Sequence, residues 1–411
     1  MSGHRGPLAV MIPSRERVIV RRGWSFEPTR FDPCEWVSQV LSALRWAAPR
    51  GLAGSTGAAN SANIRAGTAH RTPVRIRPIL PESAMPHRRT LLLTAAASAG
   101  LAAAGLAPRA HAQQRLFFGI ATGGTGGTYY PLGGMLAQLI SNKATVDGRR
   151  VTASAEAANA SVANAKLIAE KQIESAFVAA DILDAAFNGT NQFDKAPLKN
   201  LRALGALYPE TVQLITRADM NINGVRDLKG KRVSSGAPGS GQYQLLTDLL
   251  AVHGMKRDEI REDMSSFTQA VDKIKDGNLE ATLITAGVPT SAVTDFAQSH
   301  ALKLIPLAGP EIAELQKRQP YYTSVTIPAG TYRGVAAPVE TLAVMAVWAT
   351  HDALPENVAY EVTKALFENT AIMGQVHVQG RNISLKTALS VGTTPLHPGA
   401  AKYYREKGVL K

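Results

Sequence analysis

The groups in this chain that could do chemistry are concentrated in two glycine-rich turns. The first turn begins Ala121-Thr-Gly-Gly-Thr-Gly-Gly-Thr-Tyr-Tyr130 and ends at Gly134. Glycines let a backbone approach a ligand closely, and the free N–H groups of a following helix start favour a carboxylate or phosphate. The glycine spacing does not fit a dinucleotide fingerprint, because the third glycine position falls on Tyr129, and no Lys follows as in a Walker loop. We therefore expect this turn to hold a small anion, and the alternative is a tight turn without a ligand.

The second turn is Ser234-Ser-Gly-Ala-Pro-Gly-Ser-Gly-Gln242. Ser240 is placed to cap the helix that follows, while the flanking glycines expose amide donors. Ser240 has glycine on both immediate sides, which is not the G-x-S-x-G spacing of a nucleophile elbow. Taken alone, this turn fits a capped helix as well as a binding site. Together the two turns predict a binding site in which an anion lies between them.

The rest of the chain offers little catalytic chemistry. The five histidines after residue 112 show no metal-ligand spacing, and the only cysteine is Cys34. Ser161 and Asp181 each begin a predicted helix, where a capping role is the alternative to ligand binding, and Asn164 could equally lie on a solvated face. We predict no metal, no cofactor and no enzymatic activity.

The turns are positioned by alternating strands and helices. Short apolar runs predict strands at 116–122, 151–154, 176–179, 201–208, 212–216, 232–234, 281–285, 302–306 and 342–350. Helical periodicity predicts helices at 130–141, 161–170, 181–187, 242–252, 267–275, 290–299, 355–367, 371–378 and 400–407. This alternation indicates an α/β fold, and about 300 residues exceed a single core, so two lobes with a cleft between them are expected.

The net charge of +13 is unevenly distributed. Residues 1–84 hold twelve Arg and five acidic residues, and residues 85–112 add three Arg, so only +3 remains for residues 113–411. This distribution removes the case for a nucleic-acid partner. Residues 1–84 show no sustained period, and we expect them to be either upstream sequence read from a misplaced start or a disordered extension.

Residues 85–112 have the three parts of an export signal. A cationic start, Met85-Pro-His-Arg-Arg-Thr90, precedes an uncharged run from Leu91 to Leu106 and a small-x-small site at Ala110-His-Ala112. The arginine pair resembles a twin-arginine signal, and a membrane anchor is the alternative. Cleavage after Ala112 predicts a cysteine-free periplasmic protein of residues 113–411.

Six separated motifs resemble the TAXI family of solute receptors for tripartite ATP-independent periplasmic (TRAP) transporters. They are Gly123–Gly134, Leu207–Glu210, Asp227–Val233, Pro238–Gly241, Ile327–Tyr332 and Leu396–Ala400. The resemblance implies a class II periplasmic binding protein fold, in which two α/β lobes are joined by a hinge of two crossing strands. It puts residues 113–208 with 331–411 in one lobe and 209–330 in the other, with crossings near 208–216 and 323–333.

The resemblance also implies a function and a set of contacts. The receptor would be a monomer that captures a small organic anion, a glutamate-like amino acid or a C4–C5 dicarboxylate such as 2-oxoglutarate. It would deliver this ligand to TRAP membrane permease subunits, fused or separate. The implied ligand contacts are Thr122, Gly124, Thr125, Gly126, Gly127, Thr128, Tyr129, Ser161, Asn164, Asp181, Tyr208, Ser240, Gly241 and Gln242. Arg217 and Arg333 are the only arginines that we consider as partners of a ligand carboxylate. An exported sensory protein and an exported enzyme on the same fold remain alternatives.

Overall fold

The computed structural model describes residues 7–12, 17–22 and 115–411, which fall into two separate compact units divided after Gly100. The predicted export signal at 85–112 and most of the predicted extension at 1–84 lie outside the described residues. Within the first unit, β1 (Pro7–Ile12) and β2 (Arg17–Arg22) form an antiparallel hairpin with Pro7 opposite Arg22. We did not predict this hairpin from the sequence, although its Val and Ile residues favour strands.

The second unit alternates strands and helices as the sequence predicts. Its strands are β3 (Leu116–Ala121), β4 (Thr145–Val146), β5 (Arg149–Glu156), β6 (Ser175–Ala179), β7 (Leu201–Arg217), β8 (Arg232–Ser234), β9 (Arg261–Asp263), β10 (Ala281–Ala286), β11 (Leu302–Ile305), β12 (Thr323–Ile327) and β13 (Val339–His351). Its α-helices are α3 (Tyr129–Lys143), α4 (Ser161–Ala169), α5 (Ala180–Asn188), α6 (Gln242–Val252), α7 (Phe267–Lys275), α8 (Ser291–Ser299), α9 (Pro310–Arg318), α10 (Glu356–Phe367), α11 (Thr370–Met373) and α12 (Pro398–Glu406). Short 3-10 turns lie at η1 (Asn191–Phe193), η2 (Val225–Leu228), η3 (Arg257–Glu259) and η4 (Val378–Asn382).

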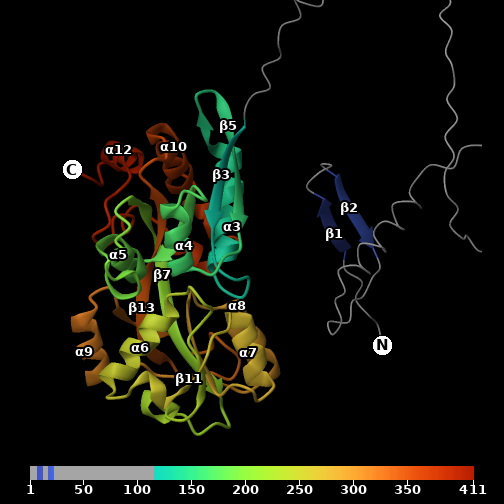
Figure 1. Cartoon of the computed structure of the whole chain (residues 1–411), viewed down its shortest axis with the longest axis vertical. Helices are drawn as coiled ribbons and strands as arrows, with labels where there is room; N and C mark the ends of the chain where they lie inside the picture. Colours follow the sequence, from blue (N-terminus) through green and yellow to red (C-terminus); the bar gives the residue numbers. More distant parts are fainter. Residues whose placement is uncertain (1–6, 13–16, 23–114) are drawn as a thin grey trace, which may run out of the picture. The chain divides into compact units, whose positions relative to one another are not determined.

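One strand order occurs twice in this unit. The first lobe has the order β5-β3-β6-β13-β7 and the second has β9-β8-β10-β7-β11. In the first lobe β3, β5 and β6 are parallel, and β13, which runs through from the second lobe, lies antiparallel beside β6. In the second lobe β8, β9 and β10 are parallel, and β7, which runs through from the first lobe, lies antiparallel beside β10. Figure 1 shows α3, α4, α5, α10 and α12 around the first lobe and α6 to α9 around the second. The fold is therefore α/β, as the sequence predicts, and its sheet is mixed.

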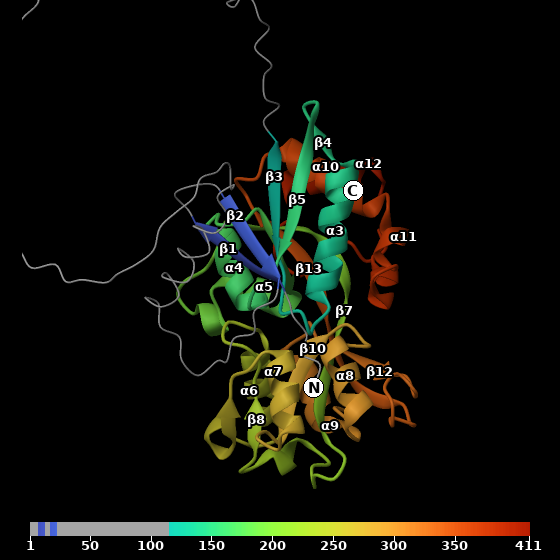
Figure 2. The ribbon, with the colours of Figure 1, turned by 90° about the vertical axis from the view of Figure 1, so that its right-hand side faces the viewer.

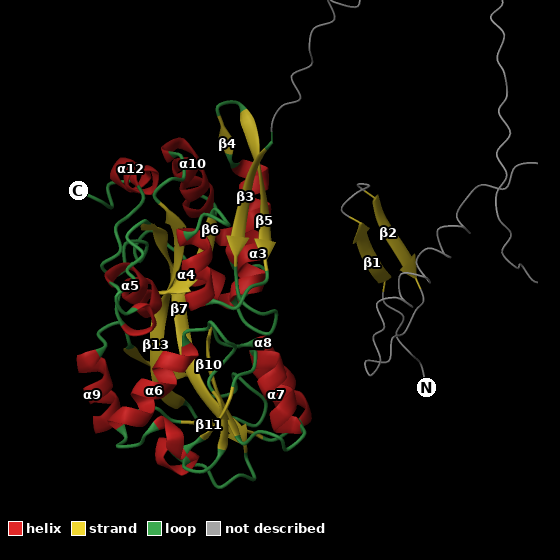
Figure 3. Ribbon diagram, viewed as in Figure 1, coloured by secondary structure: helices red, strands yellow, loops and turns green. Residues whose placement is uncertain are grey.

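The two lobes share the strands β7 and β13, which lie side by side for most of their length (Figures 2 and 3). We predicted two strands at 201–208 and 212–216, because Pro209 interrupts the apolar pattern. They are one 17-residue strand, in which Pro209 lies opposite Met345 beside an irregularity in the ladder. A proline that cannot donate to the ladder is tolerated at such an irregularity.

The second crossing strand lies later in the chain than predicted. We expected it near 323–333, but β12 only pairs with the first residues of β13, and β13 itself continues into the first lobe to pair with β6. That prediction was wrong because Leu342–Thr350 was assigned wholly to one lobe. The division of the chain at 208/209 and 330/331 stays a proposal.

Several short elements also differ from the prediction. The predicted helix at 371–378 ends at Met373 and is followed by η4, and α9 and β9 were not predicted at all. Strand β9 and helix α11 are too short to establish a period, and α9 buries only Ile312 and Leu315. In the described part of the chain, no helix combines the length and apolar character needed to cross a membrane.

The first-lobe core is packed tightly enough to exclude a methyl group at Gly205. A Cβ at this position would collide with the Tyr404 hydroxyl and approach the Phe367 ring to 3.0 Å. The Tyr404 hydroxyl is fixed in place because it donates to the Leu204 carbonyl at 2.7 Å. We expect Gly205→Ala to lower the free energy of unfolding by about 1–3 kcal/mol, measured by urea denaturation.

A matched control is Gly134→Ala in α3, where Gly134 is exposed and a Cβ would meet nothing within 4 Å. The free energy of unfolding of this variant should rise by about 0.5–1 kcal/mol, because alanine is the better helix former. Equal stabilities for the two variants would contradict the packing argument.

Candidate functional site

The first glycine-rich turn forms one wall of a cavity of about 250 Å³ between the lobes. It connects β3 to α3, and Gly123 to Tyr129 all line the cavity. Within the described part of the chain, no acceptor is recorded for the amides of Gly124, Thr125 and Gly126. The first turn of α3 also lacks a side-chain cap from Thr128. These unpaired N–H groups and the positive end of the helix dipole favour a negative ligand group.

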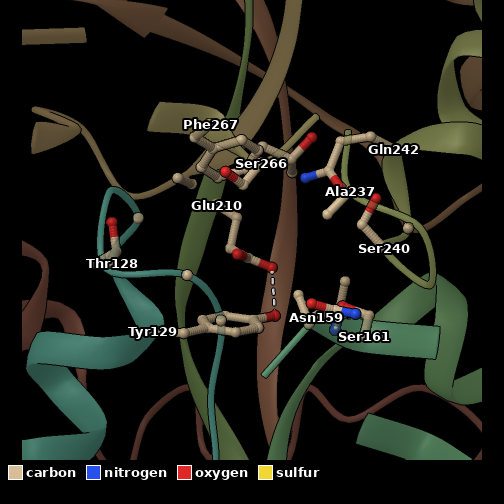
Figure 4. A pocket seen from close by; sticks show the side chains of 18 of the residues that line it. Thr128, Tyr129, Asn159, Ser161, Glu210, Ala237, Ser240, Gln242, Ser266 and Phe267 are labelled. Carbon is tan, nitrogen blue, oxygen red and sulfur yellow. Dashed lines mark hydrogen bonds between the residues drawn. The ribbon is translucent and has the colours of Figure 1, made fainter. Parts of the chain in front are cut away.

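The second turn lies on the opposite wall. Ala237, Ser240, Gly241 and Gln242 line the cavity where β8 leads into α6. The starts of α4, at Ser161, and of α7, at Ser266–Thr268, also face it, so helix N-termini from both lobes converge there (Figure 4). The Ser240 hydroxyl and the Gln242 side-chain carbonyl are buried, and neither has a partner among the described residues. Both are therefore available to a ligand.

The floor of the cavity carries a buried carboxyl group, Glu210, from the middle of β7. Glu210 is 3% exposed, and its Oε2 accepts a 2.8 Å hydrogen bond from the Tyr129 hydroxyl (Figure 4). Burial raises the pKa of Glu210 to about 8, against the lowering effect of the Tyr129 bond and with a smaller raising effect from Asp181. A carboxyl group with this pKa is mostly protonated at neutral pH.

A second carboxyl group, Asp181, lies at the start of α5. Its Oδ2 accepts a 2.6 Å hydrogen bond from the Tyr322 hydroxyl, while its Oδ1 is buried with no partner among the described residues. Burial raises the pKa of Asp181 more than the Tyr322 hydrogen bond lowers it. None of the described residues that line the cavity is Lys, Arg or His. The cavity thus combines an amide-rich wall with two carboxyl groups.

Most of the residues expected to contact a ligand lie together at this cavity. The lining includes Gly124, Thr125, Gly126, Gly127, Thr128, Tyr129, Ser161, Asp181, Ser240, Gly241 and Gln242. Their role in binding stays a prediction.

Thr122, Asn164 and Tyr208 do not line the cavity. The Asn164 side-chain amide donates to the Thr122 and Phe177 carbonyls at 2.8 Å each and so links the residue that follows β3 to the middle of β6. Thr122 donates to the Glu156 carbonyl, and Tyr208 is fully buried in the first-lobe core. These contacts support a structural role.

The two candidate arginines also lie away from the cavity. Arg217 pairs with Asp219, and Arg333 donates to the Gln298 carbonyl at 2.9 Å. An arginine salt bridge to a ligand carboxylate is therefore not available from either residue in this conformation.

Sequence reasoning missed several lining residues, above all Glu210 and Tyr322. Glu210 follows Pro209, where the apparent strand break suggested a turn. Asn159 and Phe267 belong to segments without a distinguishing motif. The only available signal was the acidic residue within the Leu207–Glu210 motif.

Hydrogen bonds join the lobes around the cavity. The Gly126 carbonyl accepts from the Ala292 amide at 3.1 Å and the Ser291 hydroxyl at 3.0 Å, both at the start of α8. On the other side, the Ala163 amide donates to the Gly239 carbonyl at 2.9 Å. A Cβ at Gly126 would collide with the Thr268 hydroxyl, and one at Gly241 would lie 2.9 Å from Ile182 Cγ1. Glycine is thus required for the close approach of the two lobes.

Two lobes that repeat one topology, two shared strands and a cavity at their junction define the fold of a periplasmic binding protein. The chain belongs to the NMT1-like family, whose model matches residues 120–408.

Solved structures of such proteins are similar at low sequence identity. The periplasmic aliphatic sulphonate binding protein SsuA from Escherichia coli is 14% identical, with a TM-score of 0.37 over 71% of this chain and 84% of that one. A binding protein component of a phosphonate ABC transporter from Pseudomonas aeruginosa is 10% identical, with a TM-score of 0.41 over 65% and 79%. A putative L-cystine ABC transporter protein from Listeria monocytogenes is 12% identical, with a TM-score of 0.38 over 66% and 98%.

The raised pKa of Glu210 makes stability depend on pH. The folded protein holds a proton at Glu210 up to about pH 8, whereas the unfolded chain loses it near its ordinary value of 4.5. The contribution of protonated Glu210 to the free energy of unfolding is fully present below about pH 4.5. As pH rises from there toward 8, the free energy of unfolding falls by up to about 1.4 kcal/mol per pH unit. We expect Glu210→Gln to remove most of this decline in urea denaturation of the ligand-free protein, while the smaller contribution of Asp181 remains.

The control is Glu156→Gln, which makes the same chemical change at an exposed carboxylate. It should leave the decline unchanged. A wild-type stability that is flat between about pH 5 and pH 8 would show that Glu210 is ionised throughout.

Proposed function

We propose that this chain is the solute receptor of a TRAP transporter of the TAXI kind, exported to the periplasm. It captures a small organic anion, either a glutamate-like amino acid or a C4–C5 dicarboxylate, and delivers it to a membrane permease driven by an ion gradient. The observation that carries this proposal is the row of unpaired amides from Gly124 to Gly126, which face a cavity between two lobes. Such amides bind a carboxylate without needing a counter-charge.

The size of the cavity supports a small ligand. Its volume of about 250 Å³ is below the roughly 300–1,000 Å³ of pockets that hold drug-sized molecules. A metabolite of four or five carbons, enclosed by closure of the lobes, suits such a space. The family membership established by residues 120–408 agrees with a binding role.

Calorimetric titration of the purified chain with a panel of small anions tests this function. The panel contains L-glutamate, L-glutamine, 2-oxoglutarate and succinate, with inorganic phosphate and an alkanesulfonate as competing chemistries. We expect one of the carboxylate ligands to bind with a Kd in the micromolar range or tighter. A micromolar Kd corresponds to a binding free energy of about −8 kcal/mol. Binding only of the phosphate or the sulfonate would overturn the carboxylate assignment, and no binding at all would overturn the receptor function.

The same titrations separate this function from an exported enzyme. Asp181 and Glu210 are the two carboxyl groups in the cavity that could act in acid–base catalysis. Conversion of any bound compound, detected by nuclear magnetic resonance after incubation, would favour the enzyme. Recovery of the ligand unchanged favours the receptor.

Closure of the lobes should depend on Gly126. A Cβ there would collide with the Thr268 hydroxyl and lie 3.3 Å from Ala292 Cβ, so Gly126→Ala holds the first turn away from the second lobe. We expect this variant to bind the panel ligand about tenfold more weakly or worse, because overpacking of this kind costs about 1–3 kcal/mol in the closed form. Small-angle scattering should also show less compaction on ligand addition than in the wild type.

The matched control is Gly134→Ala in α3, outside the cavity lining. Gly134 is exposed and a Cβ there would meet nothing within 4 Å, so the affinity of this variant should stay within about twofold of wild type. Equal losses of affinity in the two variants would mean that the effect does not come from contact between the lobes.

A further inference from the structure

The cavity has two chemically different ends. The turn from Gly124 to Gly126 supplies unpaired amides, whereas the floor supplies the carboxyl groups of Glu210 and Asp181. A dicarboxylate would bring a second negative group toward this floor. An amino acid would bring an ammonium group instead, which a carboxylate stabilises through a charge-assisted hydrogen bond.

Within residues 115–411, no basic side chain lines the cavity around Glu210. Tyr129 from α3 donates to it, and Tyr208 from β7 itself lies close enough to act on the same charge. Asp181 from α5 adds a second carboxyl group, and Tyr322, whose hydroxyl donates to Asp181, precedes β12.

The remaining neighbours of Glu210 are neutral. Val344 of β13 is its register partner, and Thr285 and Ala286 of β10, Gln242 of α6 and Phe267 of α7 line the same cavity. A carboxylate left alone in such surroundings would pay a large desolvation cost, so it is either protonated or paired with a cation that a ligand brings.

We propose that Glu210, held in place by Tyr129, recognises the ammonium group of the ligand and exchanges its own proton for it. The O–H bond of the Glu210 carboxyl group breaks, the proton leaves to solvent, and the carboxylate accepts a hydrogen bond from the ammonium group. The positive charge that enters the cavity replaces the one that leaves it. This inference rests on the proposed function, because it requires that the cavity take a small amino acid.

The electrostatics of the floor agree with this exchange. Burial raises the pKa of Glu210 to about 8, so the Glu210 carboxyl group is mostly protonated at neutral pH in the ligand-free protein. An ammonium group at hydrogen-bond distance lowers that pKa, because an opposite charge favours the ionised form. A ligand without an amine has no means to displace the proton and meets two carboxyl groups.

Calorimetry in buffers of different ionisation enthalpy measures this exchange directly. L-glutamate is titrated into the full chain near pH 7 in bis-tris and in Tris buffers, and 2-oxoglutarate serves as the analogue that lacks the amine. We expect about one proton released per L-glutamate bound near pH 7 and few released near pH 9, where Glu210 is already ionised. The apparent Kd for L-glutamate should tighten by up to about tenfold per pH unit between pH 6 and pH 8. For 2-oxoglutarate we expect weaker binding without proton release.

Two variants assign the proton to Glu210 and not to Asp181. Glu210→Gln should abolish the release and flatten the pH dependence of affinity, while the exposed Glu156→Gln should leave both unchanged. Tyr129→Phe removes the hydrogen bond that lowers the pKa of Glu210, so the rise in affinity should move to higher pH. The Tyr129→Phe variant keeps the test decisive if Glu210→Gln does not fold.

The outcomes separate the inference from the function on which it rests. L-glutamate binding without proton release, or release that persists in Glu210→Gln, overturns the role of Glu210 and leaves the receptor function standing. Tighter binding of 2-oxoglutarate than of L-glutamate overturns ammonium recognition. Failure of every compound in the panel to bind between about pH 6 and pH 9 overturns the receptor function itself.

Discussion

The structure depends on the continuity of β7 through both lobes. Its first half pairs with β13 in the first lobe, and its second half pairs with β10 and β11 in the second. The residues at its middle must therefore lie where the lobes meet. Glu210 is one of these residues, so the strand that joins the lobes also carries the buried carboxyl group of the cavity. The charge state of Glu210 is consequently set where the two lobes meet.

The sequence predicted the alternation of strands and helices well, because each element can be recognised from the spacing of apolar residues within its own segment. Strand β3, the glycine turn and helix α3 follow from an apolar run, four glycines and the spacing of Leu132, Leu136 and Leu139. The path of the chain between lobes was harder to predict. Pro209 looked like the end of a strand, yet the pairing with β13 carries the strand past it, and such pairing is not visible in a single segment. Helix α9 was missed because it buries only Ile312 and Leu315, too few positions for a period.

The site was predicted where it depends on backbone, and missed where it depends on tertiary contacts. Glycines and helix starts mark amide donors directly, and the two turns do face each other across the cavity. The polar residues Asn164 and Tyr208 were expected to contact a ligand. Instead, the Asn164 side-chain amide donates to backbone carbonyls at β3 and β6, and Tyr208 is buried in the core of the first lobe. Glu210 gave the opposite error. Its burial, its bond to Tyr129 and the lack of a cation near it arise only when α3, α5 and β7 are brought together.

The charge of the whole chain says little about the charge that a ligand would meet. The +13 of the sequence lies mostly before residue 113, and the lining of the cavity, as far as the chain is described, holds two carboxyl groups and no basic residue. An anion in this cavity is stabilised by fixed dipoles, whose strength does not change with pH. The carboxyl groups, in contrast, titrate, so their contribution depends on the proton they hold. A receptor built from these two parts would recognise a carboxylate at any pH and would distinguish an amine from a second carboxylate by whether it can replace that proton.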